Sequence, residues 1–127
     1  MKNNVVGWFE IPVTDMQRAV KFYEEVLDIQ MERHLMGSTD MAWFPMVENG
    51  LGAPGSLVKN TEFYTPSMEG TLIYLTARSG DLNNELARVE PAGGRVLQDK
   101  KQISQEYGYM AVILDTEGNR LALHSGK

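Results

Sequence analysis

The first part of the chain changes from an alternating pattern of apolar residues to a helical one. In residues 8–13, Phe9, Ile11 and Val13 fall on one side, which predicts a strand with one face covered by apolar packing. Thr14 is followed three residues later by a glutamine, a capping box that predicts a helix N-terminus. The helix is expected to run for about three turns. Its apolar stripe, which would pack on that strand face, comprises Met16, Ala19, Val20, Tyr23, Val26 and Leu27.

Between this helix and residue 60, the pattern predicts three short strands separated by turns. Residues 37–40 (Gly-Ser-Thr-Asp) and 48–50 (Glu-Asn-Gly) have the composition of turns. Residues 60–70 have no apolar period and contain Pro66 and Gly70, so they are predicted to form a linker. The three strands are expected over residues 30–36, 41–47 and 56–59.

The same order of elements restarts after the linker. Residues 71–77 alternate like a strand, and Asp81 is placed to cap a second helix with an apolar stripe of Leu82, Leu86 and Val89. The Pro-Ala-Gly-Gly sequence of residues 91–94 is expected to end this helix. Three further strands are predicted over residues 95–99, 109–115 and 120–125, with residues 115–119 forming the hairpin between the last two.

The two halves therefore form a weak internal repeat. Asp15, Met16, Val20 and Tyr23 match Asp81, Leu82, Leu86 and Val89 at a constant offset of 66 residues. We predict an α+β fold made of two tandem βαβββ modules in a single domain spanning residues 1–127. The first module is expected over about 5–59, the linker over about 60–70 and the second module over about 71–125. Each sheet would keep one helix-covered face and one open face, and the two sheets would curve around a cleft lined by the open faces.

Composition and charge narrow the class of protein. A chain of 127 residues, 43% apolar and 23% charged, has the length and make-up of one globular domain. Because the chain has no cysteine, disulfides, cysteine-based metal sites and a thiol nucleophile are excluded. The net charge of -5 argues against nucleic-acid binding, which needs a basic face. No apolar run approaches the length of a membrane helix, so we expect a soluble, cytoplasmic protein that contacts no membrane.

Several motifs in this order resemble the vicinal oxygen chelate superfamily, also called the glyoxalase, bleomycin-resistance and extradiol-dioxygenase superfamily. The resemblance covers essentially the whole chain and implies the tandem βαβββ fold. It rests on Phe-Glu-Ile-Pro-Val-Thr-Asp-Met at 9–16 with Phe-Tyr at 22–23, on Ala-Gly-Gly at 92–94 with Val-Leu at 96–97, and above all on Asp-Thr-Glu-Gly-Asn-Arg-Leu-Ala-Leu-His-Ser at 115–125.

Metal-dependent members of this superfamily carry ligands on the open faces of the sheets. In this sequence the corresponding positions, named below, carry indole, aliphatic and hydroxyl groups. These groups would not hold a divalent cation, which needs several imidazole or carboxylate groups. We therefore predict no metal and no other cofactor. Carried over to this sequence, the positions fall on Trp8, on Leu72 or Thr71, on Ala122, and near Ser56 or Leu57.

Two titratable residues remain on the predicted open faces, one from each module. Glu10 shares its side of the first strand with Trp8, and His124 shares its side of the last strand with Ala122. Within hydrogen-bond reach, Glu10 and His124 could act as a general-base pair, or they could be two ligands of a divalent metal. Glu10 could instead form a salt bridge with Arg120, and His124 could be a strand-end histidine or a dimer contact.

Aromatic residues also point to the open faces. Such rings, with a few polar groups, are typical of small-molecule sites, although ordinary packing between half-sheets or subunits would place them similarly. We predict a ligand site formed by Trp8, Trp43, Tyr74, Tyr109 and Arg120, with Tyr107 nearby.

Three functions are compatible with this pattern. The first is metal-independent binding of a small molecule in an aromatic-lined cleft. The second is an enzyme of the lactoylglutathione-lyase or epimerase type that uses Glu10 and His124, with or without a divalent metal. The third is a dimeric interaction module without a ligand. In each case, we predict a homodimer, because the modules leave open sheet faces and edge strands.

Overall fold

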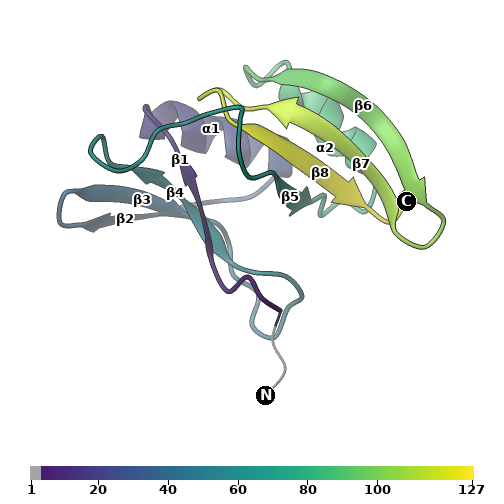
Figure 1. Ribbon diagram of the computed structural model, residues 1–127, viewed down its shortest axis with the longest axis horizontal. Coiled ribbons are helices and arrows are strands. Elements are labelled where there is room, and N and C mark those ends of the chain that lie inside the picture. The colour runs from purple at the N-terminus through teal and green to yellow at the C-terminus, as the bar shows by residue number, and fades with distance from the viewer. Residues whose placement is uncertain (1–3) are drawn as a thin grey trace.

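The computed structural model describes residues 4–127, which form the two predicted modules (Figure 1). The first contains β1 (Phe9–Pro12), α1 (Met16–Leu27), β2 (Glu32–Met36), β3 (Thr39–Trp43) and β4 (Gly55–Lys59). The second contains β5 (Ile73–Thr76), α2 (Leu82–Val89), β6 (Arg95–Ser104), β7 (Gly108–Leu114) and β8 (Arg120–Ser125). No helix of residues 4–127 is long and apolar enough to cross a membrane.

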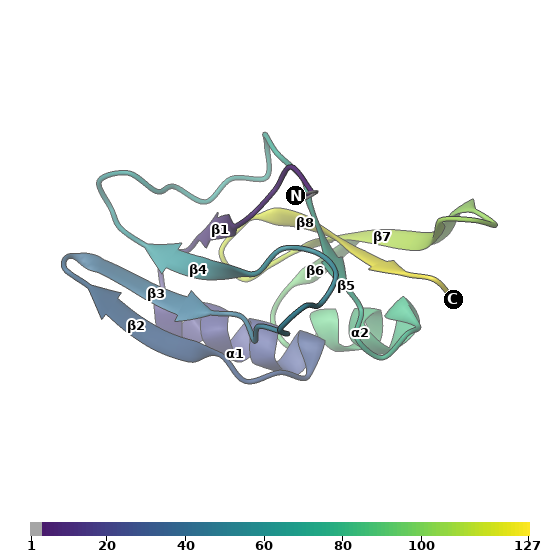
Figure 2. The same cartoon turned by 90° about the horizontal axis from the view of Figure 1, so that it is seen from below.

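Each module forms its own four-stranded mixed sheet, in the order β1-β4-β3-β2 in the first and β5-β8-β7-β6 in the second. In both sheets the first strand pairs in parallel with the last strand of its module, and the other pairs are antiparallel. The two helices lie next to each other on the same side of the strands (Figure 2). The structure thus confirms the duplicated βαβββ fold, in which each sheet has one helix-covered face.

Several predicted boundaries differ from the structure by one or more residues, and three of them change how an element begins or ends. The cap of α1 is Asp15, whose side chain accepts from the Arg18 N–H. The predicted cap, Thr14, instead donates its N–H and its hydroxyl to the Glu117 carboxylate. Strand β3 ends at Trp43 rather than at residue 47, because Pro45 has no N–H for the ladder. Strand β6 continues beyond residue 99 to Ser104 along polar residues that show no apolar period.

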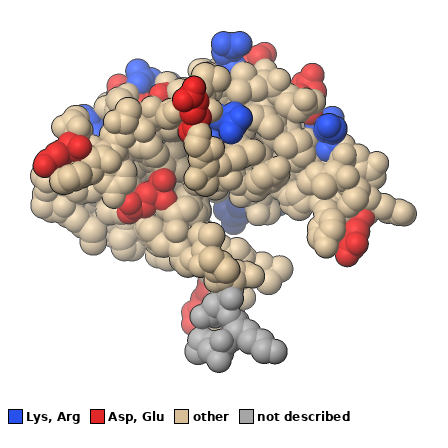
Figure 3. Space-filling model, in the orientation of Figure 1, with Lys and Arg blue, Asp and Glu red and all other residues tan. Residues whose placement is uncertain are grey.

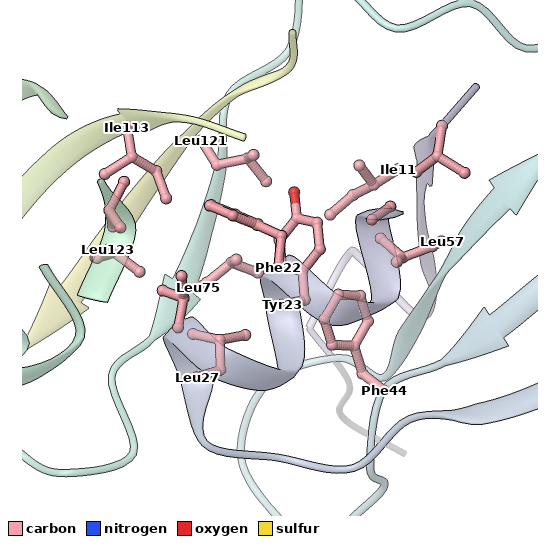
Figure 4. Close-up of a cluster of buried hydrophobic side chains, with 14 of the residues drawn as sticks. Ile11, Phe22, Tyr23, Leu27, Phe44, Leu57, Leu75, Ile113, Leu121 and Leu123 are labelled. Atoms are coloured by element: carbon pink, nitrogen blue, oxygen red, sulfur yellow. The ribbon is translucent and has the colours of Figure 1, made fainter. Parts of the chain in front are cut away.

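Helix α1 joins the two modules into one core. Figure 4 shows Phe22 and Tyr23 of α1 between Ile11 and Leu57 of the first module and Leu121 of the second. All of these side chains are almost fully buried. Removing such side chains from water contributes about 1.5–3 kcal/mol each, so the shared core is the main term that holds the modules together.

The hairpin between β7 and β8 adds a polar connection between the modules. Asp115 accepts from the Tyr23 hydroxyl of α1 at 2.6 Å and from two N–H groups of its own hairpin. Asn119 donates to the Pro12 carbonyl of β1 at 2.7 Å and accepts from the Ser67 N–H of the linker. Burial, together with the Asp115 carboxylate, raises the pKa of Tyr23 well above its ordinary value. The hairpin motif that resembles the superfamily therefore has a structural role here.

Glu117 of the same hairpin binds the start of α1. Its carboxylate accepts from the Thr14 and Asp15 N–H groups at 2.8 Å each and from Arg18 Nε at 2.7 Å. The side chain is fully buried. Glu117 thus adds a second negative charge, beside that of Asp15, at the positive N-terminal end of α1.

Candidate functional site

Glu10 of β1 lies on the sheet face away from the helices, because its neighbour Ile11 points into the core. Its carboxylate accepts from the Tyr64 hydroxyl at 2.6 Å and from Trp8 Nε1 at 3.4 Å. The first bond raises the pKa of Tyr64 above its ordinary value. These two bonds hold Glu10 in place. Each carboxylate oxygen can accept more than one hydrogen bond, so Glu10 can still accept from a ligand.

Glu10 is one end of a polar row across this face, formed with Ser56 of β4 and Trp43 of β3. The Ser56 hydroxyl and Trp43 Nε1 are buried and have no hydrogen-bond partner within residues 4–127. Trp43 packs edge-on against Trp8 at 5.7 Å and stacks on His34 at 3.8 Å between ring centres. Buried polar groups without partners are uncommon in proteins, which makes this face a candidate for binding polar groups.

A cavity of about 180 Å³, here called the junction cavity, lies where β1, the linker and the start of β8 meet. Glu10 lines it from the first module and Arg120 lines it from the second. The ion pairs within residues 4–127 all join other residues, so Arg120 forms a direct ion pair with neither Glu10 nor Glu69, the second carboxylate that lines the cavity. The remaining lining residues are Ile11, Pro12, Thr65, Ser67, Glu69, Thr71, Ile73, Asn119 and Leu121.

The structure does not bring Glu10 and His124 together. His124 lies on the open face of β8, and its Nε2 donates to the Tyr107 carbonyl at 2.6 Å. Arg120 lines the junction cavity with Glu10, whereas His124 lies four residues further along the strand, roughly 13 Å at about 3.3 Å per residue. The two side chains therefore have different partners and line different parts of the surface.

The predicted aromatic residues do not share one cleft. Trp8 and Trp43 lie together on the open face of the first module, as expected. Tyr74 is half exposed on β5 and lines a separate, apolar cavity. The placement of Tyr109 is wrong: it lies on the helix side of β7 with Ala111 and Ile113, packed against the core and beneath Lys100. Both faces of β7 carry apolar residues, so alternation alone did not show which face is the core. The Tyr107 side chain is exposed in the turn before β7.

The residues at the superfamily's ligand positions do not fit a divalent metal. Ser56 and Ala122 are fully buried on the open faces, and Trp8 packs on Trp43. Within residues 4–127, no three His, Cys, Asp or Glu side chains are grouped so that they could hold a metal ion. The donor set at these positions offers at most the hydroxyls of Ser56 and Thr71, with no imidazole or carboxylate, so we assign no metal-dependent step to this chain.

Tyr64 was not among the residues that the sequence indicated. It lies in the linker, which folds over the first sheet and is fastened by the Asn60 side chain to Thr39 Oγ1 at 3.0 Å (Figure 2). Because the neighbouring Phe63 is also aromatic and is exposed, no local signal singled out Tyr64. The position of its partner depends on how the linker folds back, which no local pattern encodes.

Solved structures share this fold at low sequence identity. A glyoxalase I mutant from Zea mays aligns with a TM-score of 0.69 at 16% identity, over 94% of this chain and 46% of the maize chain. A glyoxylase/bleomycin resistance protein/dioxygenase domain from Frankia sp. EAN1pec aligns with a TM-score of 0.70 at 17% identity, over 100% and 94% of the two chains. A hypothetical protein from S. aureus aligns with a TM-score of 0.67 at 20% identity, over 98% and 95%.

At these identities the structural likeness establishes the fold alone, and the chain spans about half the length of the maize glyoxalase I chain. No curated protein was significantly similar in sequence. A sequence profile of the Glyoxalase/Bleomycin resistance protein/Dioxygenase superfamily matches residues 5–123. That match includes both modules and the hairpin that joins them, so the chain belongs to the Glyoxalase/Bleomycin resistance protein/Dioxygenase superfamily.

Proposed function

We propose that this chain binds a small polar organic molecule in the junction cavity without a metal ion. The observation that carries the proposal is the Glu10 carboxylate, held by Tyr64 and Trp8, in the same cavity as Arg120. Glu10 would accept hydrogen bonds from the ligand, and the Arg120 guanidinium would donate to an oxygen of the ligand. Charge-assisted hydrogen bonds of this kind contribute about 1.5–3 kcal/mol each, enough to orient a small molecule.

The size of the cavity limits the ligand. The volume of the junction cavity is about 180 Å³. Pockets for drug-sized ligands usually have about 300–1,000 Å³. The proposed ligand is therefore a small metabolite, with its polar groups toward Glu10 and Arg120 and the linker as one wall.

The test is a thermal-shift screen of small polar metabolites on protein treated with a chelator. A ligand at a hundred times its Kd adds about 2.7 kcal/mol to the stability of the folded state. Glu10→Gln and Arg120→Gln are each expected to weaken a bound ligand roughly tenfold or more. Glu62→Gln in the exposed linker and Arg95→Gln at the exposed start of β6 change the same charges away from the cavity and should leave binding unchanged. Stabilisation that needs an added divalent metal, or that survives both cavity substitutions, would contradict the proposal.

We also propose that the chain is a homodimer. Strand β2 is an edge of its sheet, and Leu35 and Met36 on it are exposed. An exposed apolar edge strand is a template for pairing with another chain. Light scattering at micromolar concentration is expected to give a mass close to twice 14.3 kDa. Leu35→Lys should shift the mass toward one chain, whereas a wild-type mass of one chain would rule out the dimer.

A further inference from the structure

A second cavity between the modules has a different chemical character from the junction cavity. It measures about 310 Å³ and shares no lining residue with the junction cavity. We call it the apolar cavity. Most of its lining comes from aromatic and aliphatic side chains: Phe9, Leu27, Ile29, Phe44, Pro45, Val47, Leu51, Ala53, Pro54, Tyr74 and Leu75.

The aromatic wall of the apolar cavity depends on a glycine. The rings of Phe9 and Phe44 lie 5.6 Å apart between centres and are tilted by 37°. A side-chain carbon at Gly55 would lie 2.4 Å from the Phe9 ring, so this ring rests directly on the β4 backbone. Gly55 thereby lets Phe9 lie flat as one wall of the apolar cavity.

Among residues 4–127, Arg78 is the only charged residue that lines the apolar cavity. It takes part in none of the ion pairs within residues 4–127. It also borders a neighbouring cavity with Asp28 and Glu85 and forms an ion pair with neither. The Glu85 carboxylate already accepts from the Ser79 N–H and hydroxyl and lies near Arg88. The guanidinium of Arg78 can therefore donate to an incoming anion, and carboxylates match its paired donors.

We infer that the apolar cavity binds an amphipathic carboxylate, a hydrocarbon chain or ring that ends in one carboxylate group. The hydrocarbon part lies against Phe9, Phe44 and Leu75, and the carboxylate pairs with Arg78. Apolar walls with a single polar anchor are the usual make-up of a ligand pocket, and about 310 Å³ reaches the usual range. This inference is independent of the proposed function, because the two cavities have no residue in common.

Three probes with the same tail and different head groups test it: octanoate, 1-octanol and octylamine. Calorimetric titration of the whole protein is expected to give the tightest binding for octanoate and the weakest for octylamine. Arg78 is exposed, so Arg78→Gln should weaken octanoate by about two- to fivefold and leave 1-octanol unchanged. Tyr74→Ala, which truncates a half-exposed side chain, should weaken octanoate and 1-octanol alike.

Two matched variants serve as controls. Arg95→Gln removes an exposed arginine outside the apolar cavity, and Glu10→Gln alters only the junction cavity, so both should bind octanoate like the wild type. Octanoate is also expected to shift the methyl NMR signals of Leu27 and Leu75. Octylamine binding equal to octanoate binding, an unchanged affinity in Arg78→Gln, or octanoate shifts confined to the junction cavity would overturn the inference. A second copy of the chain that covers these methyl groups in solution would also overturn it.

Discussion

Asp115→Ala is expected to lower the free energy of unfolding by about 3 kcal/mol or more, because it leaves several buried donors without an acceptor. The Tyr23 hydroxyl, which is fully buried, loses its partner at 2.6 Å. The N–H groups of Glu117 and Asn119 lose the same carboxylate. Each unsatisfied buried group costs about 1–3 kcal/mol, so this single change should outweigh most surface substitutions.

Urea unfolding of Asp115→Ala, Tyr23→Phe and the double variant measures this effect. In the Tyr23→Phe background the hydroxyl is already gone, so Asp115→Ala should cost less than it does in the wild type. Asp99→Ala, at an exposed residue of β6, is the matched control and should change stability by less than about 0.5 kcal/mol. Equal costs for Asp115→Ala in both backgrounds would show that the Tyr23 bond is not the coupling between the modules.

Glu117→Gln is expected to remove about 3 kcal/mol of stability at neutral pH. Burial raises the pKa of Glu117, but Arg18, the Asp15 and Thr14 N–H groups and the Thr116 hydroxyl outweigh burial and lower the pKa from 4.5 to about 2. Because the folded state has the lower pKa, the stabilisation is complete above about pH 4.5 and is lost as the pH falls through about 2.

The pH dependence separates this charge effect from a loss of packing. Urea midpoints measured at pH 7 and pH 3 should show that the gap between the wild type and Glu117→Gln shrinks to roughly half or less at the lower pH. Glu106→Gln, in the exposed turn before β7, should behave like the wild type at both values. A gap that stays constant between pH 7 and pH 3 would mean that the Glu117 charge does not stabilise the start of α1.

The parts of the fold that the sequence predicted are those set by local patterns. Asp81 caps α2 as predicted, because a short carboxylate before an apolar stripe bonds the first free N–H groups. The matched Asp15 caps α1 in the same way, although Thr14 was the predicted cap. Alternation along β1 and β8 correctly divided core from open face. The turn at 115–119 was also predicted correctly, from a glycine that can take a positive φ, and Gly118 has a φ of 92° in the structure.

The predicted site was less accurate because it depended on contacts between distant segments. Alternation put Glu10 and His124 on open faces but carried no information on their distance. Tyr109 was misplaced because residues 109–114 are apolar on both faces, so the alternation did not show that Tyr109 shares the core face with Ala111 and Ile113. Tyr64 was missed because the linker's path over the first sheet follows from bonds made by Asn60 and Asn119 rather than from local propensity.

The hydrogen bonds that the β7–β8 hairpin makes to the first module also explain how a site can form between weakly similar modules. Asn119 links the linker to β1 and is itself part of the junction cavity wall. Few charges of either sign gather on the face seen in Figure 3, where acidic and basic side chains are scattered. Ligand selection is therefore expected to depend on the individual charges of Glu10 and Arg120 rather than on a broad electrostatic surface.

The most direct test of the proposed function is an NMR map of the small metabolite that stabilises the protein most. Backbone amide spectra of chelator-treated protein would be recorded with increasing amounts of that metabolite. Metal-independent binding in the junction cavity predicts shifts at residues 10–11, 65–73 and 119–121, without added metal, that need a much higher metabolite concentration in Glu10→Gln. Shifts that appear only with a divalent metal, or that fall outside these segments, would contradict it.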